Sequence, residues 1–127
     1  MVAEATFLPT TPAELRQRGG DALDVILVSG DAYIDSPFSG IALIGRTLEA
    51  AGLRVGIIAQ PDTESLDDIR RLGAPRLFWG ISAGAVDSMV ANYTAGGKPR
   101  RQDDFTPGGV NNRRPDRACI IYANLLR

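Results

Sequence analysis

The sequence contains no histidine and a single cysteine, Cys119. Without imidazole, the chain cannot supply a histidine general base, a Ser-His-Asp triad or most zinc sites. One cysteine cannot form an internal disulfide, a Cys-x-x-Cys redox pair or the ligand set of an iron–sulfur cluster. No apolar run approaches the roughly 18 residues of a membrane span. These absences are typical of a soluble cytoplasmic domain that is not catalytic by itself.

The chain has the size and composition of one folded domain. Its 127 residues include 44% hydrophobic and 23% charged residues, close to the globular average, which excludes a disordered chain. Residues 1–97 carry seven basic and twelve acidic groups, net −5, whereas residues 98–127 carry seven basic and three acidic groups, net +4. A basic tail could contact nucleic acid or face a neighbouring domain.

Three apolar runs without alternation predict strands that are buried on both faces, at residues 24–29, 54–59 and 76–81. Two helical patterns separate them, at residues 39–51 and 63–72. This strand–helix alternation predicts an α/β fold with three layers, doubly wound around a mainly parallel, Rossmann-like sheet of four or more strands. Trp79 and Phe78 are expected in the core.

The region after the third strand differs in character. Residues 96–117 are rich in Arg, Gly and Pro and lack periodicity, and such a long loop usually serves function or partner contact. Residues 118–123 predict a fourth strand, with Cys119 as an inert core thiol. We therefore expect a core over residues 21–95, an Arg-rich irregular segment over 96–117 and a final strand over 118–123. Because the chain ends four residues later, we expect it to be a piece of a longer protein.

The fold predicts where a ligand would bind. In open parallel sheets, ligands bind at the carboxyl ends of the strands. The small and polar residues expected there are Gly30, Asp31, Tyr33, Asp35, Ser36, Asp62, Ser82, Ala83 and Gly84. Ordinary turn and cap chemistry accounts for the same residue types, so both interpretations stay open. Neither a Gly-x-Gly-x-x-Gly nor a P-loop motif is present, which disfavours nicotinamide and nucleoside triphosphate binding.

Several long segments resemble one family, the YgiQ-type radical SAM proteins. The resemblance covers nearly the whole chain in order, through residues 26–37, 56–62, 84–95, 103–109 and 113–118. It implies that this stretch is an N-terminal accessory domain, and that a downstream barrel carries a Cys-x-x-x-Cys-x-x-Cys motif for a [4Fe–4S] cluster and S-adenosylmethionine. No catalytic residue of that family maps onto this chain, and the resemblance supplies no substrate.

The resemblance also makes cobalamin a candidate ligand of this domain, because many radical SAM proteins carry a cobalamin-binding domain of similar fold. Histidine-ligated cobalamin domains use Asp-x-His-x-x-Gly after the first strand. Here Asp31 is present, but Tyr33 replaces the histidine and Ser36 the glycine. A histidine ligand is therefore excluded, whereas binding of a corrinoid without a protein ligand stays open.

Two functional hypotheses follow. In the first, the chain is an accessory domain of a radical SAM enzyme, contributes to the substrate or cofactor site beside the barrel, and could be a degenerate cobalamin-type domain. In the second, the chain is a non-catalytic module that grips RNA or protein through residues 98–117. Only Phe105 is aromatic in that segment, so a base-stacking platform is absent. We therefore favour a third role for these arginines, lining the interface with the barrel.

Overall fold

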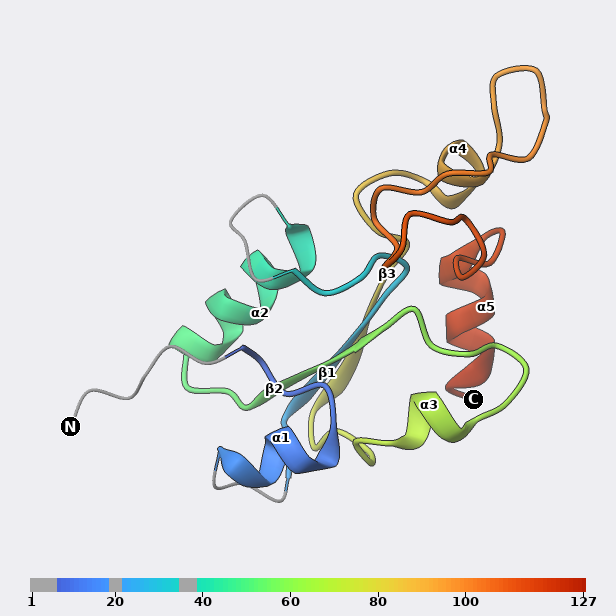
Figure 1. Cartoon of the computed structure of the whole chain (residues 1–127). Coiled ribbons are helices and arrows are strands. Elements are labelled where there is room, and N and C mark those ends of the chain that lie inside the picture. Colours follow the sequence, from blue (N-terminus) through green and yellow to red (C-terminus); the bar gives the residue numbers. More distant parts are fainter. Residues whose placement is uncertain (1–6, 19–21, 35–38) are drawn as a thin grey trace.

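The structure is a computed structural model, which describes residues 7–18, 22–34 and 39–127. Within these described ranges, three strands and five helices follow one another in the order that Figure 1 shows. In chain order they are α1 (Pro12–Gln17), β1 (Val25–Ser29), α2 (Gly40–Ala50), β2 (Val55–Ala59), α3 (Asp67–Arg70), β3 (Phe78–Ser82), α4 (Ser88–Asn92) and α5 (Ala118–Leu125). The α/β class predicted from the sequence is confirmed.

The strands form one parallel sheet in the order β2-β1-β3. β1 is buried at all five positions because it lies between the other two strands. The order returns from β2 across β1 to β3, which is typical of a doubly wound, Rossmann-like sheet. The expectation of four or more strands was wrong, since the described residues form three.

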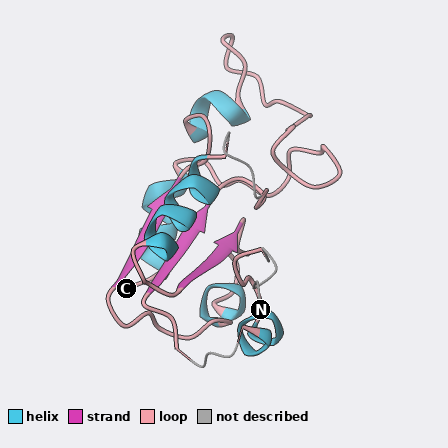
Figure 2. Ribbon diagram, turned by 90° about the vertical axis from the view of Figure 1, so that its left-hand side faces the viewer, coloured by secondary structure: helices cyan, strands magenta, loops and turns pink. Residues whose placement is uncertain are grey.

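Helices cover both faces of this sheet, as Figures 1 and 2 show. Side chains alternate along β1, so Val25 and Leu27 pack on the face covered by α2. Ile26 and Val28 pack on the opposite face, where α1, α3 and α5 contribute four further core residues. These residues are Leu15, Ile69, Ala118 and Tyr122. The predicted arrangement in three layers is therefore present.

The predicted final strand over residues 118–123 is wrong, because these residues form the first part of α5. The helix begins where the Ala118 N–H donates to the Ser88 hydroxyl at 3.0 Å. Ala118 and Tyr122, four residues apart, share the buried face of this helix. Cys119 points away from that face and is exposed, so the prediction of a buried core thiol is also wrong.

Smaller corrections concern the edges of elements. The predicted helix over residues 63–72 is the single turn of α3, and the third strand begins two residues later than predicted. Phe78 is 47% exposed instead of buried, because β3 lies at the edge of the sheet. Residues 96–117 contain no helix and only isolated bridges. Within the described residues, no helix is long and apolar enough to span a membrane.

Candidate functional site

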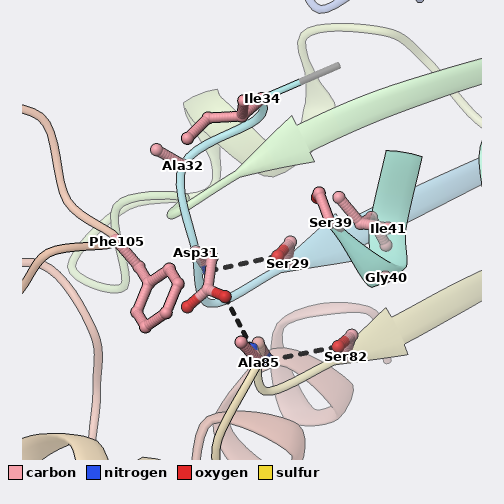
Figure 3. Close-up of a pocket in the computed structure, with 11 residues that line it drawn as sticks. Ser29, Asp31, Ala32, Ile34, Ser39, Gly40, Ile41, Ser82, Ala85 and Phe105 are labelled. Atoms are coloured by element: carbon pink, nitrogen blue, oxygen red, sulfur yellow. Dashed lines mark hydrogen bonds between the residues drawn. The ribbon is translucent and has the colours of Figure 1, made fainter. Parts of the chain in front are cut away.

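A cavity of about 180 Å³ opens at the carboxyl ends of β1 and β3, beside the start of α2 (Figure 3). This is the position that a parallel sheet offers to a ligand. Residues from four separate parts of the chain line it: Ser29, Asp31, Ala32, Ile34, Ser39, Gly40, Ile41, Ser82, Gly84, Ala85 and Phe105. The location predicted from the sequence is thus a cavity in the structure.

The floor of the cavity is polar and its walls are apolar. Ser29 and Ser82 are register partners on the neighbouring strands β1 and β3. The Ser29 hydroxyl accepts the N–H of Asp31 at 3.1 Å, and the Ser82 hydroxyl accepts the N–H of Gly84 at 3.1 Å. Because a hydroxyl can accept and donate, both protons remain able to donate to a ligand.

A buried ionic network stands directly behind this floor. The side chain of Arg114 is fully buried and binds two carboxylates. One guanidinium nitrogen donates to Asp31 Oδ1, and the other donates to Asp103 Oδ2 at 2.8 Å. The second oxygen of Asp31 accepts the backbone N–H of Ala85 at 2.6 Å. Both carboxylate oxygens of Asp31 are therefore bonded within the protein, and Asp31 does not act as a free base.

The same network joins the Arg-rich segment to β2. The Thr106 hydroxyl donates to Asp103 at 2.6 Å and accepts from Gln60 Nε2 at 2.6 Å. Gln60 follows β2 and also donates to the Gly30 carbonyl at 3.1 Å. The Ala32 N–H donates to the Phe105 carbonyl at 2.7 Å, which holds Phe105 over the cavity. These bonds fix the irregular segment against the carboxyl ends of the strands.

Two glycines allow this close packing. A Cβ on Gly30 would collide with the carbonyl of Ala83, and a Cβ on Gly84 would collide with the carboxylate of Asp31. Gly84 also has a φ of +120°, which residues with side chains rarely adopt. These positions are therefore glycine because backbone and carboxylate meet there.

The predicted site residues divide into separate groups. Asp31, Ser82 and Gly84 line the cavity, whereas Gly30 and Ala83 contact each other just behind it. The Tyr33 hydroxyl accepts the N–H of Leu8 at 3.0 Å, and its ring packs against the core beneath α2. Asp62 is exposed and accepts the N–H of Glu64 at 2.9 Å. Asp35 and Ser36 lie outside the described residues.

Sequence reasoning missed the residues that the Arg-rich segment contributes. Arg114 lies 83 positions from Asp31, and no periodicity connects them. The segments that carry these residues, 103–109 and 113–118, were among those that showed the family resemblance. That shared pattern was the signal that could have placed them at the site.

Two arginines of the Arg-rich segment, Arg100 and Arg114, form bonds within the protein. Arg114 is buried, and the Arg100 Nε donates to the carbonyls of Val90 and Tyr93 at 2.9 and 3.0 Å. Beside them, the Tyr93 hydroxyl donates to Asp116 at 2.5 Å. This hydrogen bond raises the pKa of Tyr93 and lowers that of Asp116. Arg100 and Arg114 are therefore parts of the fold and not a free basic surface.

Tyr122 of α5 lies near the ionic network of Arg114 and Asp31 and is fully buried. Its hydroxyl has no hydrogen-bond partner among the described residues, and neither does the Nε of Arg114. Burial raises the pKa of Tyr122 to about 12, an effect that the nearby Arg114 cation partly offsets. The phenol is therefore held in its neutral form.

Fold and site together describe an α/β domain with a small cavity at the carboxyl ends of its strands. Residues 7–127 match the Radical SAM N-terminal family, and the chain belongs to it. It is 58% identical over 121 residues to a UPF0313 protein of Fusobacterium nucleatum and 60% identical over 121 residues to one of Thermotoga maritima. A UPF0313 protein of Methanosarcina acetivorans is 53% identical over 121 residues.

These relatives are much longer than the chain. The matches cover 95% of this chain, but 21% of the Fusobacterium and Thermotoga proteins and 16% of the Methanosarcina protein. The resemblance to YgiQ-type proteins is thereby confirmed at the level of the family. No solved structure matches the chain.

Proposed function

We propose that this chain is the N-terminal accessory domain of a radical SAM iron–sulfur enzyme and forms one wall of its substrate or cofactor site. The observation that carries the proposal is the cavity at the carboxyl ends of β1 and β3, which is lined in part by Asp31 of the Arg114 network. Membership of the Radical SAM N-terminal family and the length of the relatives support a catalytic unit downstream.

In this proposal, residues of the downstream catalytic unit carry out the redox chemistry, and residues of this chain do not. Among the described residues, no group of three or more His, Cys, Asp and Glu side chains is placed to hold a metal ion. Downstream residues would bind the [4Fe–4S] cluster and S-adenosylmethionine, whose reductive cleavage supplies a 5′-deoxyadenosyl radical. The residues of this chain would bind and orient a polar group through Ser29 and Ser82, and Ile34 and Phe105 would exclude water.

A corrinoid does not fit the cavity as it stands. Small-molecule pockets usually have volumes of about 300 to 1,000 Å³, above the 180 Å³ found here. The carboxylate of Asp31, which stands where a cobalamin motif would begin, is held by Arg114 and Ala85. We therefore propose a site for part of a smaller ligand, completed by the downstream unit.

The class of enzyme is tested with the full-length protein purified without oxygen. We expect absorbance near about 400 nm from the cluster, and conversion of S-adenosylmethionine to methionine and 5′-deoxyadenosine under reducing conditions. Protein that carries no cluster after reconstitution and cleaves no S-adenosylmethionine would contradict the proposal.

The role of the cavity is tested with Ser82→Val in the same full-length protein. Valine fills the floor with a methyl group and removes the hydroxyl donor, so we expect the rate of 5′-deoxyadenosine formation to change at least about fivefold at unchanged cluster absorbance. Ser65→Val is the matched control, because Ser65 is half-buried just before α3, outside the cavity, and its hydroxyl likewise accepts a backbone N–H, that of Asp67. Equal rates for both variants would exclude the cavity from the site.

A further inference from the structure

The outer edge of β3 has free backbone groups. On the side facing β1, the N–H of Phe78 donates to Asp24 and the carbonyl of Ser82 accepts from Gly30. In a parallel ladder, alternate residues of a strand bond to the same neighbour. The N–H and C=O groups of Trp79 and Ile81 therefore point away from β1, and no strand pairs with them among the described residues.

The opposite edge of the sheet is protected. There the N–H of Ile57 in β2 donates to the carbonyl of Pro9 at 2.9 Å, and Leu8 is completely buried beside it. The chain before α1 thus covers β2. An uncovered strand edge invites pairing with another strand, and folded proteins normally block it. The contrast singles out β3 as the open edge.

Helix α5 returns the chain to the beginning of that edge. Its first residue, Ala118, is bonded to Ser88, which follows the carboxyl end of β3. Its last turn lines a cavity with Trp79 and with Gly73, which precedes β3. α5 therefore runs antiparallel to β3 along its flank, with the red C-terminal end in Figure 1 near α3.

The hand of the connection decides where a next parallel strand would lie. Strand–helix–strand connections in one sheet are right-handed in about 98% of cases. The helix α3 connects β2 to β3 on the face that α5 also covers. A right-handed connection from β3 through α5, on this same face, would continue across the sheet in the direction that leads from β2 to β3. It would therefore place the next strand on the outer edge of β3.

The surface of α5 supports a further covering element. Residues 118–126 contain no charged side chain. Ala118 and Tyr122 are buried, yet Ile120 on the outer surface is 56% exposed, and Leu77 just before β3 is 60% exposed. A helix that is apolar on several faces is typical of a buried position.

We propose that the segment that follows this region in the longer relatives forms a fourth parallel strand on the outer edge of β3. It would pair with the free backbone groups of Trp79 and Ile81, giving the strand order β2-β1-β3-β4. An apolar, β-branched sequence fits this place, because α5 would cover one face of the added strand. The proposal goes beyond the proposed function, since it requires no cleavage of S-adenosylmethionine.

Amide hydrogen exchange measured by NMR tests this pairing. Two chains are compared. One is residues 1–127 alone, and the other carries in addition about 15 residues of the Thermotoga maritima relative, taken from directly after its region that matches this chain; this length is enough for a turn and a strand. We expect the amides of Trp79 and Ile81 to exchange at least about tenfold more slowly in the extended chain. The amide of Gly80, which faces β1 in both chains, is the internal control and should change less than about twofold.

Three results would overturn the proposal. Trp79 and Ile81 could exchange equally fast in both chains, or Gly80 could slow by the same factor, which would indicate general stabilisation. Protection of Trp79 and Ile81 in the 127-residue chain that rises with protein concentration would assign the edge to a second copy. None of these results bears on S-adenosylmethionine cleavage, so the outcome is independent of the proposed enzyme class.

Discussion

The substitution Arg114→Met tests the buried network that shapes the cavity. Methionine fills a similar volume but leaves the carboxylates of Asp31 and Asp103 without their shared cation. Breaking a buried ion pair by removing one partner costs about 3 to 5 kcal/mol. Domains of this size have a total free energy of unfolding of about 5 to 15 kcal/mol, so the variant would lose a large share of it.

Urea unfolding followed by the fluorescence of Trp79, the sole tryptophan, measures this loss. With a denaturant slope of about 2 kcal/mol per M, the midpoint should fall by about 2 M. The neighbouring, exposed Arg113 provides the control Arg113→Met, which should change stability by less than about 0.5 kcal/mol. If both variants unfold at the same urea concentration, Arg114 does not hold the site together and the reasoning is refuted.

Three further outcomes are expected. Gly84→Ala should lower the free energy of unfolding in urea by at least about 2 kcal/mol, because the added Cβ would meet the carboxylate of Asp31. Gly108 also has a positive φ but open space around it, so Gly108→Ala should cost about 1 kcal/mol. Equal costs for the two variants would contradict the close contact at Gly84. Raising the pH from 10 to 12 should lower the free energy of unfolding by about 2 kcal/mol, because the phenol of Tyr122 ionises first in the unfolded chain, and Tyr122→Phe should remove that contribution; an unchanged pH dependence would assign the effect elsewhere. Single-stranded RNA should bind residues 98–117 with a Kd no tighter than about 10⁻⁴ M, and a steep salt dependence with tighter binding would revive the nucleic-acid hypothesis.

The central part of the fold could be predicted because it depends on local patterns. The runs that form β1 and β2 are apolar without alternation, since helices cover both faces of the sheet. The periodicity that predicted a helix over residues 39–51 corresponds to α2 within one residue at each end. In both cases, neighbours in sequence carry the information.

The errors occurred where tertiary contacts decide. The run from Cys119 to Tyr122 has the apolar, β-branched composition of a buried strand, and short apolar runs do not distinguish strand from helix. Ser88, 30 residues earlier, bonds the first N–H of the helix that forms there. The ionic network was equally inaccessible, because Arg114 meets Asp31 across 83 positions. The positions at the carboxyl ends of the strands followed from topology, but the residues behind them did not.

The central claim is that the cavity at the carboxyl ends of β1 and β3 faces the downstream catalytic unit. The most direct test is the maleimide labelling rate of Ile34→Cys, read by mass spectrometry on the peptide that contains position 34. Ile34 lines the cavity and is 55% exposed in the isolated domain, and Ile44 on the outer side of α2 is 50% exposed. In the full-length protein, we predict that labelling at position 34 slows at least about tenfold while Ile44→Cys changes less than about twofold. Equal labelling of position 34 in the isolated domain and the full-length protein would contradict the account.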